Sequence, residues 1–554
     1  MPSVRRLFQA LPALRRVQLG LAAALAVTLL LAAGGPSMGE ISGKIQELLA
    51  ADASAKIPWE LDADLGLHWA ARINAVLLLA LLLTARWWLR PWTASAKPPA
   101  NPKKALPRWC VFAVIAVAIL GTALRLPLAS KSLWWDELWV IRQCSHGTWK
   151  EDTKAAEPGA LKFSPTTWKR CAFYYQKPTN HVPMSLLQKA SLDVWRKVTG
   201  APRHEFSDLA ARLPALALSL AAVVLTAWLL AAWGAAPAAV LAGALLMAVH
   251  PLAIRYGVDA RAYALVMPLA VSALLAVTRL VRSAGRSTAA WVWLGLNQCL
   301  WLWAFPHGLL DVLVMTLLLA AVLGQAQTNW QDRWTVWCRL LVTHVLAGLL
   351  FVQLFLPNFT QALRWASQEN QGHVLDAVIL KDALAQLGTG LRWREPALGT
   401  DLGAGLRDLN SLPGPPWVSA LCLGLIGLVI LATLVARCRR TAAPVWFLAA
   451  LWFSSVLFAC LSHVVEFYYY TRFSIALIPA VALSLTLAWS GWRSLAGRAH
   501  GIFLLAWVAL ALWGGQTLLS RPIEPVRDAA AWLDTAKTGG KTRVLAYGHG
   551  REAL

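Results

Sequence analysis

The chain has 554 residues, of which 58% are hydrophobic and only 14% are charged. This is more apolar side chain than a single soluble core buries, so the sequence indicates a polytopic membrane protein. The composition excludes a cytosolic enzyme, a secreted disulfide scaffold and a disordered tail protein. The formal net charge of +23 comes from small Lys and Arg clusters at the ends of apolar runs, and this placement predicts no nucleic-acid partner.

The predicted elements are apolar runs of roughly 20 residues, and about 13 of them follow one another along the chain. They lie at 17–33, 69–89, 107–126, 207–230, 237–254, 260–281, 289–305, 308–324, 340–356, 417–436, 443–461, 471–489 and 501–519. Each is long enough to cross a bilayer as a helix. The sequence therefore predicts an all-α polytopic membrane protein with about 13 transmembrane helices.

Lys and Arg in the short loops predict the orientation, because cytoplasmic loops carry an excess of both. Four arginines precede the first run and place the N-terminus in the cytoplasm: Arg5, Arg6, Arg15 and Arg16. Counted over the short connections, about 20 cations fall inside and about 5 outside. With an odd number of spans, the C-terminus and the longer acidic loops are then expected outside.

The runs and loops divide the chain into three predicted regions. Residues 1–104 form an N-terminal extension with two spans and an acidic outer loop. Residues 105–520 form a transmembrane domain with long outer loops at 129–206 and 357–416. Residues 521–554 form a short outer tail, either a small cap or a truncated periplasmic domain.

The first long outer loop is predicted to contain an interfacial helix at 181–198. Leu187, Val194 and Val198 fall on one side of this helix, and Lys189 and Lys197 point away from it. Such a helix would lie flat on the membrane.

The same loop contains two cysteines, Cys144 and Cys171. An oxidising outer compartment favours a disulfide between them. The alternative is two free, buried thiols.

A segment rich in tryptophan and acid follows the third run directly, with the sequence Lys-Ser-Leu-Trp-Trp-Asp-Glu-Leu-Trp. Asp136 and Glu137 lie there among Trp134, Trp135 and Trp139, at the predicted bilayer surface. Loss of hydration at such a place favours a carboxylate that acts as a general base. The alternative is an interfacial tryptophan belt with solvated acids.

Residues 250–263 form the connection between the fifth and sixth runs. Arg255 and Asp259 are four residues apart, as are Asp259 and Tyr263, so a helical arrangement would gather them with Arg261 at one surface. Guanidinium groups suit phosphate, which makes this connection a candidate anion site. The alternative is an outward-facing cluster of ion pairs.

Further polar groups stand at the predicted outer ends of spans. They include His181, His307, Tyr470 and Arg472. Taken singly, such groups are also typical of snorkelling side chains and of the aromatic belt. The sequence contains no Cys or His spacing of a metal site, no Gly-rich phosphate loop and no nucleophile elbow. We therefore predict no bound metal and no nucleotide cofactor, and a divalent cation has no support from residue spacing.

With these segments in this order, residues 105–490 resemble the GT-C superfamily of integral-membrane glycosyltransferases. The resemblance is strongest to bacterial relatives of the protein O-mannosyltransferases and of lipid A aminoarabinose transferase. It rests on the motifs Ser-Leu-Trp-Trp-Asp-Glu, Phe-Ser-Asp-Leu-Ala-Ala-Arg-Leu-Pro, Asp-Ala-Arg-Ala-Tyr and Tyr-Thr-Arg-Phe-Ser. It implies a GT-C fold whose outer loops carry interfacial helices, with loop 129–206 catalytic and loop 357–416 covering the substrate.

The resemblance also implies an activity and a place. A sugar would move from a polyprenyl-phosphate donor to a hydroxyl group of a lipid, glycan or protein, on the periplasmic side of a bacterial inner membrane. Asp136 would be the base, Glu137 its partner and Asp259 the second outer acid. The implied ligands of the donor phosphate are Arg255, Arg261, Arg472 and Tyr263. The implied contacts of the acceptor or the sugar are Trp135, His181, His307 and Tyr470.

One outer acid pair without a second nucleophile predicts inversion at the anomeric carbon by single displacement. A transporter or flippase of a lipid-linked saccharide is the main alternative, because it too would have an outer cationic cavity and many spans. Transporters more often place ionisable groups near mid-membrane and are built on internal repeats, which favours the enzyme here. A structural assembly subunit is a third alternative, and it does not explain why acids and arginines converge at one surface.

Overall fold

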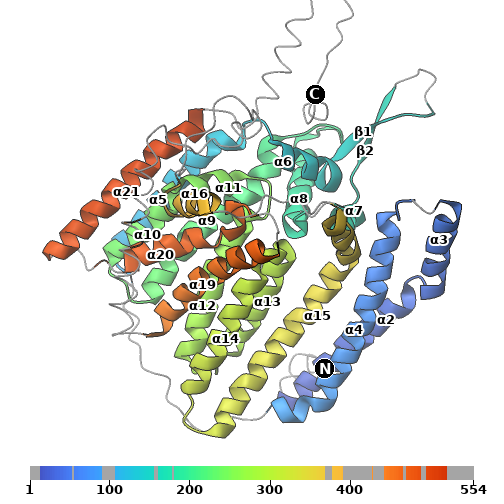
Figure 1. Cartoon of the computed structure of the whole chain (residues 1–554), viewed down its shortest axis with the longest axis horizontal. Coiled ribbons are helices and arrows are strands. Elements are labelled where there is room, and N and C mark those ends of the chain that lie inside the picture. The colour runs from blue at the N-terminus through green and yellow to red at the C-terminus, as the bar shows by residue number, and fades with distance from the viewer. Residues whose placement is uncertain are drawn as a thin grey trace, which may run out of the picture. The chain divides into compact units, whose positions relative to one another are not determined.

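The structure is a computed structural model that describes residues 13–52, 55–89, 106–154, 160–176, 180–368, 377–390, 442–465, 469–487, 489 and 494–520, with positions 424 and 427. Apart from those two positions, the predicted span 417–436 lies outside the described residues, as do the tail 521–554 and parts of loop 357–416. Almost all described elements are helices, which confirms the predicted class (Figure 1). The chain folds into two compact units, which are described one after the other.

Among the described residues, nine helices are long and apolar enough to cross a membrane, and a bent helix pair adds a tenth. This confirms a polytopic membrane protein but not the predicted number of about 13 spans. Two predicted runs form helices that are not among these spans. The run at 289–305 gives a helix of 17 residues, which is its predicted length, whereas the run at 471–489 gives one of 11 residues, which is shorter than predicted. At 1.5 Å per residue, the latter covers about 17 Å of a hydrocarbon core of about 30 Å.

The first unit comprises residues 1–102, 173–178 and 275–370. Its helices are α2 (Ala13–Gly34), α3 (Met38–Ala51), α4 (Trp59–Trp88), α13 (Thr288–Ala304), η2 (Pro306–Gly308), α14 (Leu309–Gln325) and α15 (Trp330–Gln368). In Figure 1, α2 and α4 run side by side and α3 joins them. A capping box of Ser37 and Glu40 begins α3. Helix α4 also packs on α15, where Asn74 of α4 donates to the Leu349 carbonyl (3.1 Å) and to Gln353 Oε1 (3.0 Å).

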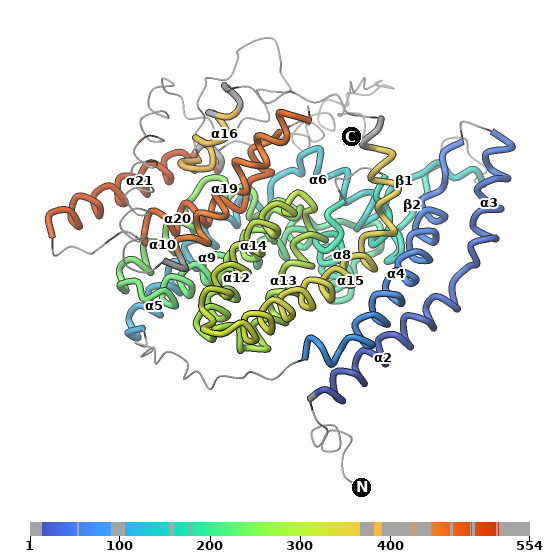
Figure 2. The backbone as a smooth tube through the Cα atoms, turned by 60° about the horizontal axis from the view of Figure 1, so that its bottom comes forward, coloured from blue at the N-terminus to red at the C-terminus, as the bar shows by residue number. Residues whose placement is uncertain are grey.

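The second unit comprises residues 103–172, 179–274 and 371–554. Its membrane helices are α5 (Arg108–Ala129), α9 (Asp208–Ala232), α10 (Pro237–Val249), α11 (Pro251–Val258), α19 (Ala442–Val464), α20 (Leu477–Leu487) and α21 (Leu495–Ser520), while α12 (Tyr263–Arg282) begins in it. Figures 1 and 2 show α10, α20 and α21 side by side. Leu246, Leu485 and Trp507 are buried between these helices. Helix α11 contacts α5, α9 and α21, so the packed helices of this unit hold it in place.

The fifth predicted run is not one helix, because α10 and α11 meet at an angle of 59°. Pro251 has no N–H to donate to the Met247 carbonyl, so the helical hydrogen bonds stop there. Arg125 of α5 supplies the missing hydrogen-bond donors. Its guanidinium donates to the carbonyls of Met247 (3.4 Å) and Ala248 (2.8 Å), and Leu252 N donates to His250 Nδ1 (3.2 Å). The break directs α11 across α5 and α9.

Loop 129–206 has more structure than the sequence indicated. It contains α6 (Trp135–Val140), η1 (Ile141–Ser145), the antiparallel strands β1 (Gly147–Glu151) and β2 (Leu161–Pro165), α7 (Trp168–Phe173) and α8 (Val182–Thr199). The hairpin β1–β2 was not predicted, because its short strands alternate weakly between polar and apolar side chains. The two loop cysteines, Cys144 and Cys171, are free, buried thiols.

Helix α8 confirms the helix predicted at 181–198, and its apolar side is exposed. Val194 and Val198 are exposed, the latter to 79%. The predicted direction of Lys189, away from the apolar side, is confirmed. Lys189 is buried, lies over the Trp168 ring (5.2 Å) and pairs with Asp193 (3.4 Å), because the polar side of α8 packs on the protein. An exposed apolar helix face suits contact with lipid.

Candidate functional site

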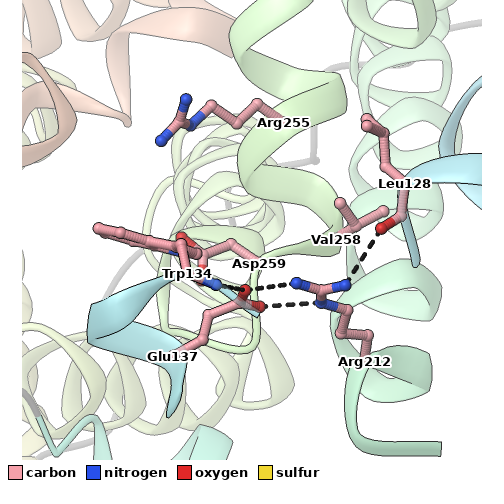
Figure 3. A pocket seen from close by; sticks show the side chains of 7 residues that line it. All are labelled: Leu128, Trp134, Glu137, Arg212, Arg255, Val258 and Asp259. Carbon is pink, nitrogen blue, oxygen red and sulfur yellow. Dashed lines mark hydrogen bonds and ion pairs between the residues drawn. The ribbon is translucent and has the colours of Figure 1, made fainter. Parts of the chain in front are cut away.

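Glu137 is a fully buried carboxylate at the start of α6. Arg212 of α9 approaches it side-on, with Nε 3.0 Å from Oε1 and Nη2 2.5 Å from Oε2 (Figure 3). Ala260 N donates to Oε1 (2.7 Å) and Trp134 N donates to Oε2 (3.4 Å). The charge is thus neutralised and both oxygens are occupied. Glu137 therefore ties α6 to α9 and to the connection between α11 and α12.

Arg212 extends this network toward α5. Its Nη1 donates to the carbonyls of Leu128 (3.1 Å) and Lys131 (2.6 Å), and its Nη2 donates to that of Ser132 (3.2 Å). These carbonyls belong to the end of α5 and the segment that leads to α6. The pair of Glu137 and Arg212 is thus a scaffold that sets where α6 begins.

Asp136 precedes Glu137 in α6 and points to different partners. Its Oδ2 accepts hydrogen bonds or ion pairs from Arg261 Nη1 (2.8 Å) and Arg472 Nη2 (3.4 Å). Its side chain is 20% exposed, whereas that of Glu137 is 1% exposed. Of the two predicted acids, Asp136 is the one that a substrate can reach.

Trp134 gathers the arginines of the candidate anion site. Its ring centroid lies 5.8 Å from the guanidinium carbon of Arg255, 5.5 Å from that of Arg261 and 5.6 Å from that of Arg472. All of these distances are within the range of cation–π attraction. Arg255 comes from α11, Arg261 from the connection before α12, and Arg472 from η3 (Thr471–Ser474). The structure thus brings together Arg255 and Arg261 of the connection 250–263 and Arg472 of the separate Tyr-Thr-Arg-Phe-Ser motif.

Sequence reasoning missed the central position of Trp134 and selected its neighbour Trp135. Trp134 is 6% exposed, and Trp135 is half-buried as the first residue of α6. Trp134 directly precedes that helix, and its extended backbone turns the indole toward the arginines. The only signal in the sequence was the position of Trp134 two residues before the candidate acid Asp136.

Asp259 lies between α11 and α12 and is 4% exposed. Neither of its carboxylate oxygens has a hydrogen-bond partner among the described residues. Burial, and then the charge of Glu137, raise the pKa of Asp259 to about 7, although Arg261, Arg255 and Arg212 oppose this rise.

The predicted helical spacing around Asp259 is wrong, because α11 ends at Val258 and α12 begins at Tyr263. The connection between the two helices is extended at Asp259, with φ −62° and ψ 126°. Arg255, Asp259 and Arg261 are nevertheless buried and gathered, so the alternative of an outward-facing ion-pair cluster is excluded.

The remaining predicted residues have different positions. Tyr263 is buried beneath Arg261, with 5.1 Å between its ring centroid and the guanidinium carbon. The His181 ring lies 5.6 Å from the Tyr263 ring, and the Tyr470 ring lies 4.3 Å from the Arg472 guanidinium carbon. These residues surround the arginine cluster. His307 belongs to the first unit, where its ring lies 4.9 Å from that of Phe305.

A pocket opens beside this cluster in the second unit (Figure 3). It is lined by Leu128, Trp134, Glu137, Arg212, Arg255, Val258 and Asp259. Outside the neutral pair of Glu137 and Arg212, the site has three arginines and two carboxyl groups, so it carries a positive charge. In the part of the chain that the structure describes, no three His, Cys, Asp or Glu side chains gather as a metal site. The arrangement suits an anion next to a proton acceptor.

The sequence matches no model of a known protein family and no characterised protein. The function is therefore inferred from the chemistry of the residues themselves. Buried arginines with carboxylates at the ends of membrane helices are costly to maintain, and in membrane proteins such groups mark functional sites.

Proposed function

We propose that the protein is a membrane glycosyltransferase that moves a sugar from a polyprenyl-phosphate donor to a hydroxyl acceptor at the periplasmic face of a bacterial inner membrane. The observation that carries this proposal is the cluster of Arg255, Arg261 and Arg472 around Trp134, with Asp136 at hydrogen-bond distance from Arg261. Guanidinium groups are the preferred ligands of a phosphate. A lipid-linked phosphate would reach them from the adjoining bilayer.

The reaction is an inverting single displacement. Asp136 takes the proton of the acceptor hydroxyl while the acceptor oxygen attacks the anomeric carbon. The bond between that carbon and the phosphate oxygen breaks, and its electron pair stays on the leaving polyprenyl phosphate. Phosphate is already a good leaving group, so the enzyme mainly supplies a base, alignment and cations.

The surrounding residues have supporting roles in this proposal. Glu137 and Arg212 position α6, so Glu137 acts through its neighbour. Asp259 is the second acid and lies beside Arg255 and Arg261, where it moderates their charge. Trp135, His181 and Tyr470 are proposed contacts of the acceptor or the sugar.

The test is transfer from radiolabelled polyprenyl-phosphate hexoses and pentoses to membrane extracts by the purified full-length protein. We expect Asp136→Asn to lose about 100-fold or more of the rate, because general-base catalysis contributes roughly 10²–10⁴-fold. Asp208→Asn is the matched control, because it removes another outer carboxylate, which stands at the first position of α9.

Two outcomes would count against the proposal. Equal transfer by the wild type and Asp136→Asn would remove Asp136 as the base. If neither protein transfers sugar while both bind the labelled lipid, a transporter or flippase of the lipid-linked saccharide becomes the better account.

A further inference from the structure

Asp136 and the donor phosphate would use the same cations. The carboxylate already takes Arg261 Nη1 (2.8 Å) and Arg472 Nη2 (3.4 Å), two of the arginines that hold the phosphate in the proposed function. We propose that Asp136 occupies the anion site when the donor is absent, and that the donor phosphate displaces it and thereby frees the base. This inference rests on the proposed function.

The geometry makes the two anions competitors. Carboxylate and phosphate oxygens both bind guanidinium N–H groups, and the N–H groups of Arg261 Nη1 and Arg472 Nη2 that face Asp136 would have to turn to the phosphate. A carboxylate that is paired with cations also accepts a proton less readily. Asp136 is therefore inactive while it holds the arginines and becomes a base only after an anion has replaced it. Donor binding thus precedes productive acceptor binding.

The exchange also couples proton transfer to departure of the phosphate. When Asp136 takes the acceptor proton it becomes neutral, so it no longer competes for Arg261 and Arg472. In the same step the phosphate gains the electron pair of the broken bond and needs those cations most. The arginines therefore hold the phosphate more strongly in the transition state than in the ground state, which is the condition for catalysis. When Asp136 later loses its proton, its carboxylate competes for the arginines again and helps the lipid phosphate to leave.

The exchange requires that the arginines stay gathered when the carboxylate leaves them. Trp134 provides this support, because three guanidinium carbons lie 5.5–5.8 Å from its ring centroid. Arg261 also lies over Tyr263 (5.1 Å) and Arg472 over Tyr470 (4.3 Å). An aromatic face attracts a guanidinium without using its N–H groups, so these groups stay available to an incoming anion.

The test measures binding of farnesyl phosphate to the full-length protein in detergent by titration calorimetry. Removal of the internal competitor should tighten binding, so we expect Asp136→Asn to bind about tenfold more tightly than the wild type, which corresponds to about 1.4 kcal/mol. Asp136→Ser is a second variant without charge. Asp208→Asn removes an equal charge elsewhere and should change affinity far less. Farnesol controls for the lipid chain, and inorganic phosphate shows how much of the affinity comes from the head group.

A double-mutant cycle separates direct competition from general electrostatics. In an Arg472→Gln background, the gain from Asp136→Asn should shrink, because one of the shared cations is gone. The exchange is overturned if Asp136→Asn and Asp136→Ser bind no more tightly than the wild type, or if Asp208→Asn gains as much. It is also overturned if farnesol binds as well as farnesyl phosphate.

The binding measurements and the transfer assay together distinguish this inference from the proposed function. Tighter binding by Asp136→Asn without any glycosyl transfer by the wild type would support the exchange and refute the glycosyltransferase. Transfer by the wild type with unchanged binding by both Asp136 variants would support the glycosyltransferase and refute the exchange.

Discussion

Asp136 and Glu137 are adjacent carboxylates with different surroundings. Successive side chains of a helix diverge by about 100°, so one points to Arg212 and the other to Arg261 and Arg472. Glu137 has its charge neutralised and its oxygens occupied, whereas Asp136 remains partly exposed. At the scale of single residues, burial and partners separate a buried, fully paired acid from one that stays accessible.

The first prediction concerns Arg212. Arg212→Met leaves the carboxylate of Glu137 buried without a cation, and breaking a buried ion pair in this way costs about 3–5 kcal/mol. We expect a large fall in the apparent Tm in detergent. Arg203→Met removes an exposed arginine and serves as the control. Equal apparent Tm values for the two variants would contradict a scaffold role for Arg212.

The second prediction concerns the pH dependence of stability. The pKa of Asp259 in the folded protein is about 7, above its ordinary value of 3.8. The folded state therefore holds this proton more tightly than the unfolded state, and the contribution of Asp259 to stability falls as the pH rises from 3.8 to about 7. Glu137 raises this pKa, and Arg261 and Arg255 lower it.

Asp259→Asn keeps the shape of the side chain and removes the proton equilibrium. Relative to the wild type, we expect the variant to gain stability with rising pH across this interval and to hold the gain above about pH 7. The measurement is the apparent Tm of both proteins as a function of pH. Parallel curves for the two proteins would show that Asp259 does not titrate in this range.

At the scale of elements, the break between α10 and α11 places Arg255 in the site. Pro251 ends the hydrogen bonding of α10, and Arg125 satisfies the carbonyls that the break leaves free. Arg125 Nε also donates to Ser219 Oγ of α9 (2.8 Å). A cation that is wholly buried among membrane helices is costly, and its hydrogen bonds to α9 and α10 offset that cost.

The third prediction tests this arrangement through Gly257 of α11. A Cβ atom at this position would meet the Ser219 side chain and would lie 2.9 Å from Arg125 Nε. We therefore expect Gly257→Ala to cost about 1–3 kcal/mol and to reduce glycosyl transfer, because α11 carries Arg255. Gly348→Ala is the control, since a Cβ atom there has nothing within 4 Å. Equal stability and equal transfer for both variants would show that the contact is not needed.

At the scale of the whole molecule, the apolar helices establish an integral membrane protein, and its orientation is a prediction from Lys and Arg placement. The turn between α9 and α10 contains no Lys or Arg. Its side of the membrane is therefore the part of the predicted orientation with the least support from charged residues. This turn and the hairpin β1–β2 are predicted on opposite sides of the membrane.

The fourth prediction uses single cysteines at exposed positions in a Cys460→Ser background, because Cys460 is exposed. Lys150→Cys in β1 should react with a membrane-impermeant maleimide in spheroplasts. Ala236→Cys in the turn should react only after the membrane is permeabilised. The background protein measures labelling of the native cysteines. Labelling of both positions in intact spheroplasts would overturn the predicted orientation.

The sequence by itself determined the protein class and most of the span positions. The lengths of the apolar runs determine both without tertiary information. A helix that crosses a bilayer requires about 20 apolar residues and internal hydrogen bonding of its backbone. It also selected Asp136, Arg255, Arg261 and Arg472 as candidates, because charged groups at the ends of apolar runs stand out from their surroundings.

Only the tertiary structure decided which acid is buried, what gathers the arginines and where the fifth run breaks. Glu137 meets Arg212 across 75 positions of sequence and Ala260 across 123. The guanidiniums meet at Trp134 because α6, α11 and η3 converge there. Hydropathy and local spacing describe one element at a time, whereas burial, ion pairing and the pKa of Asp259 depend on neighbours that folding brings from distant parts of the chain.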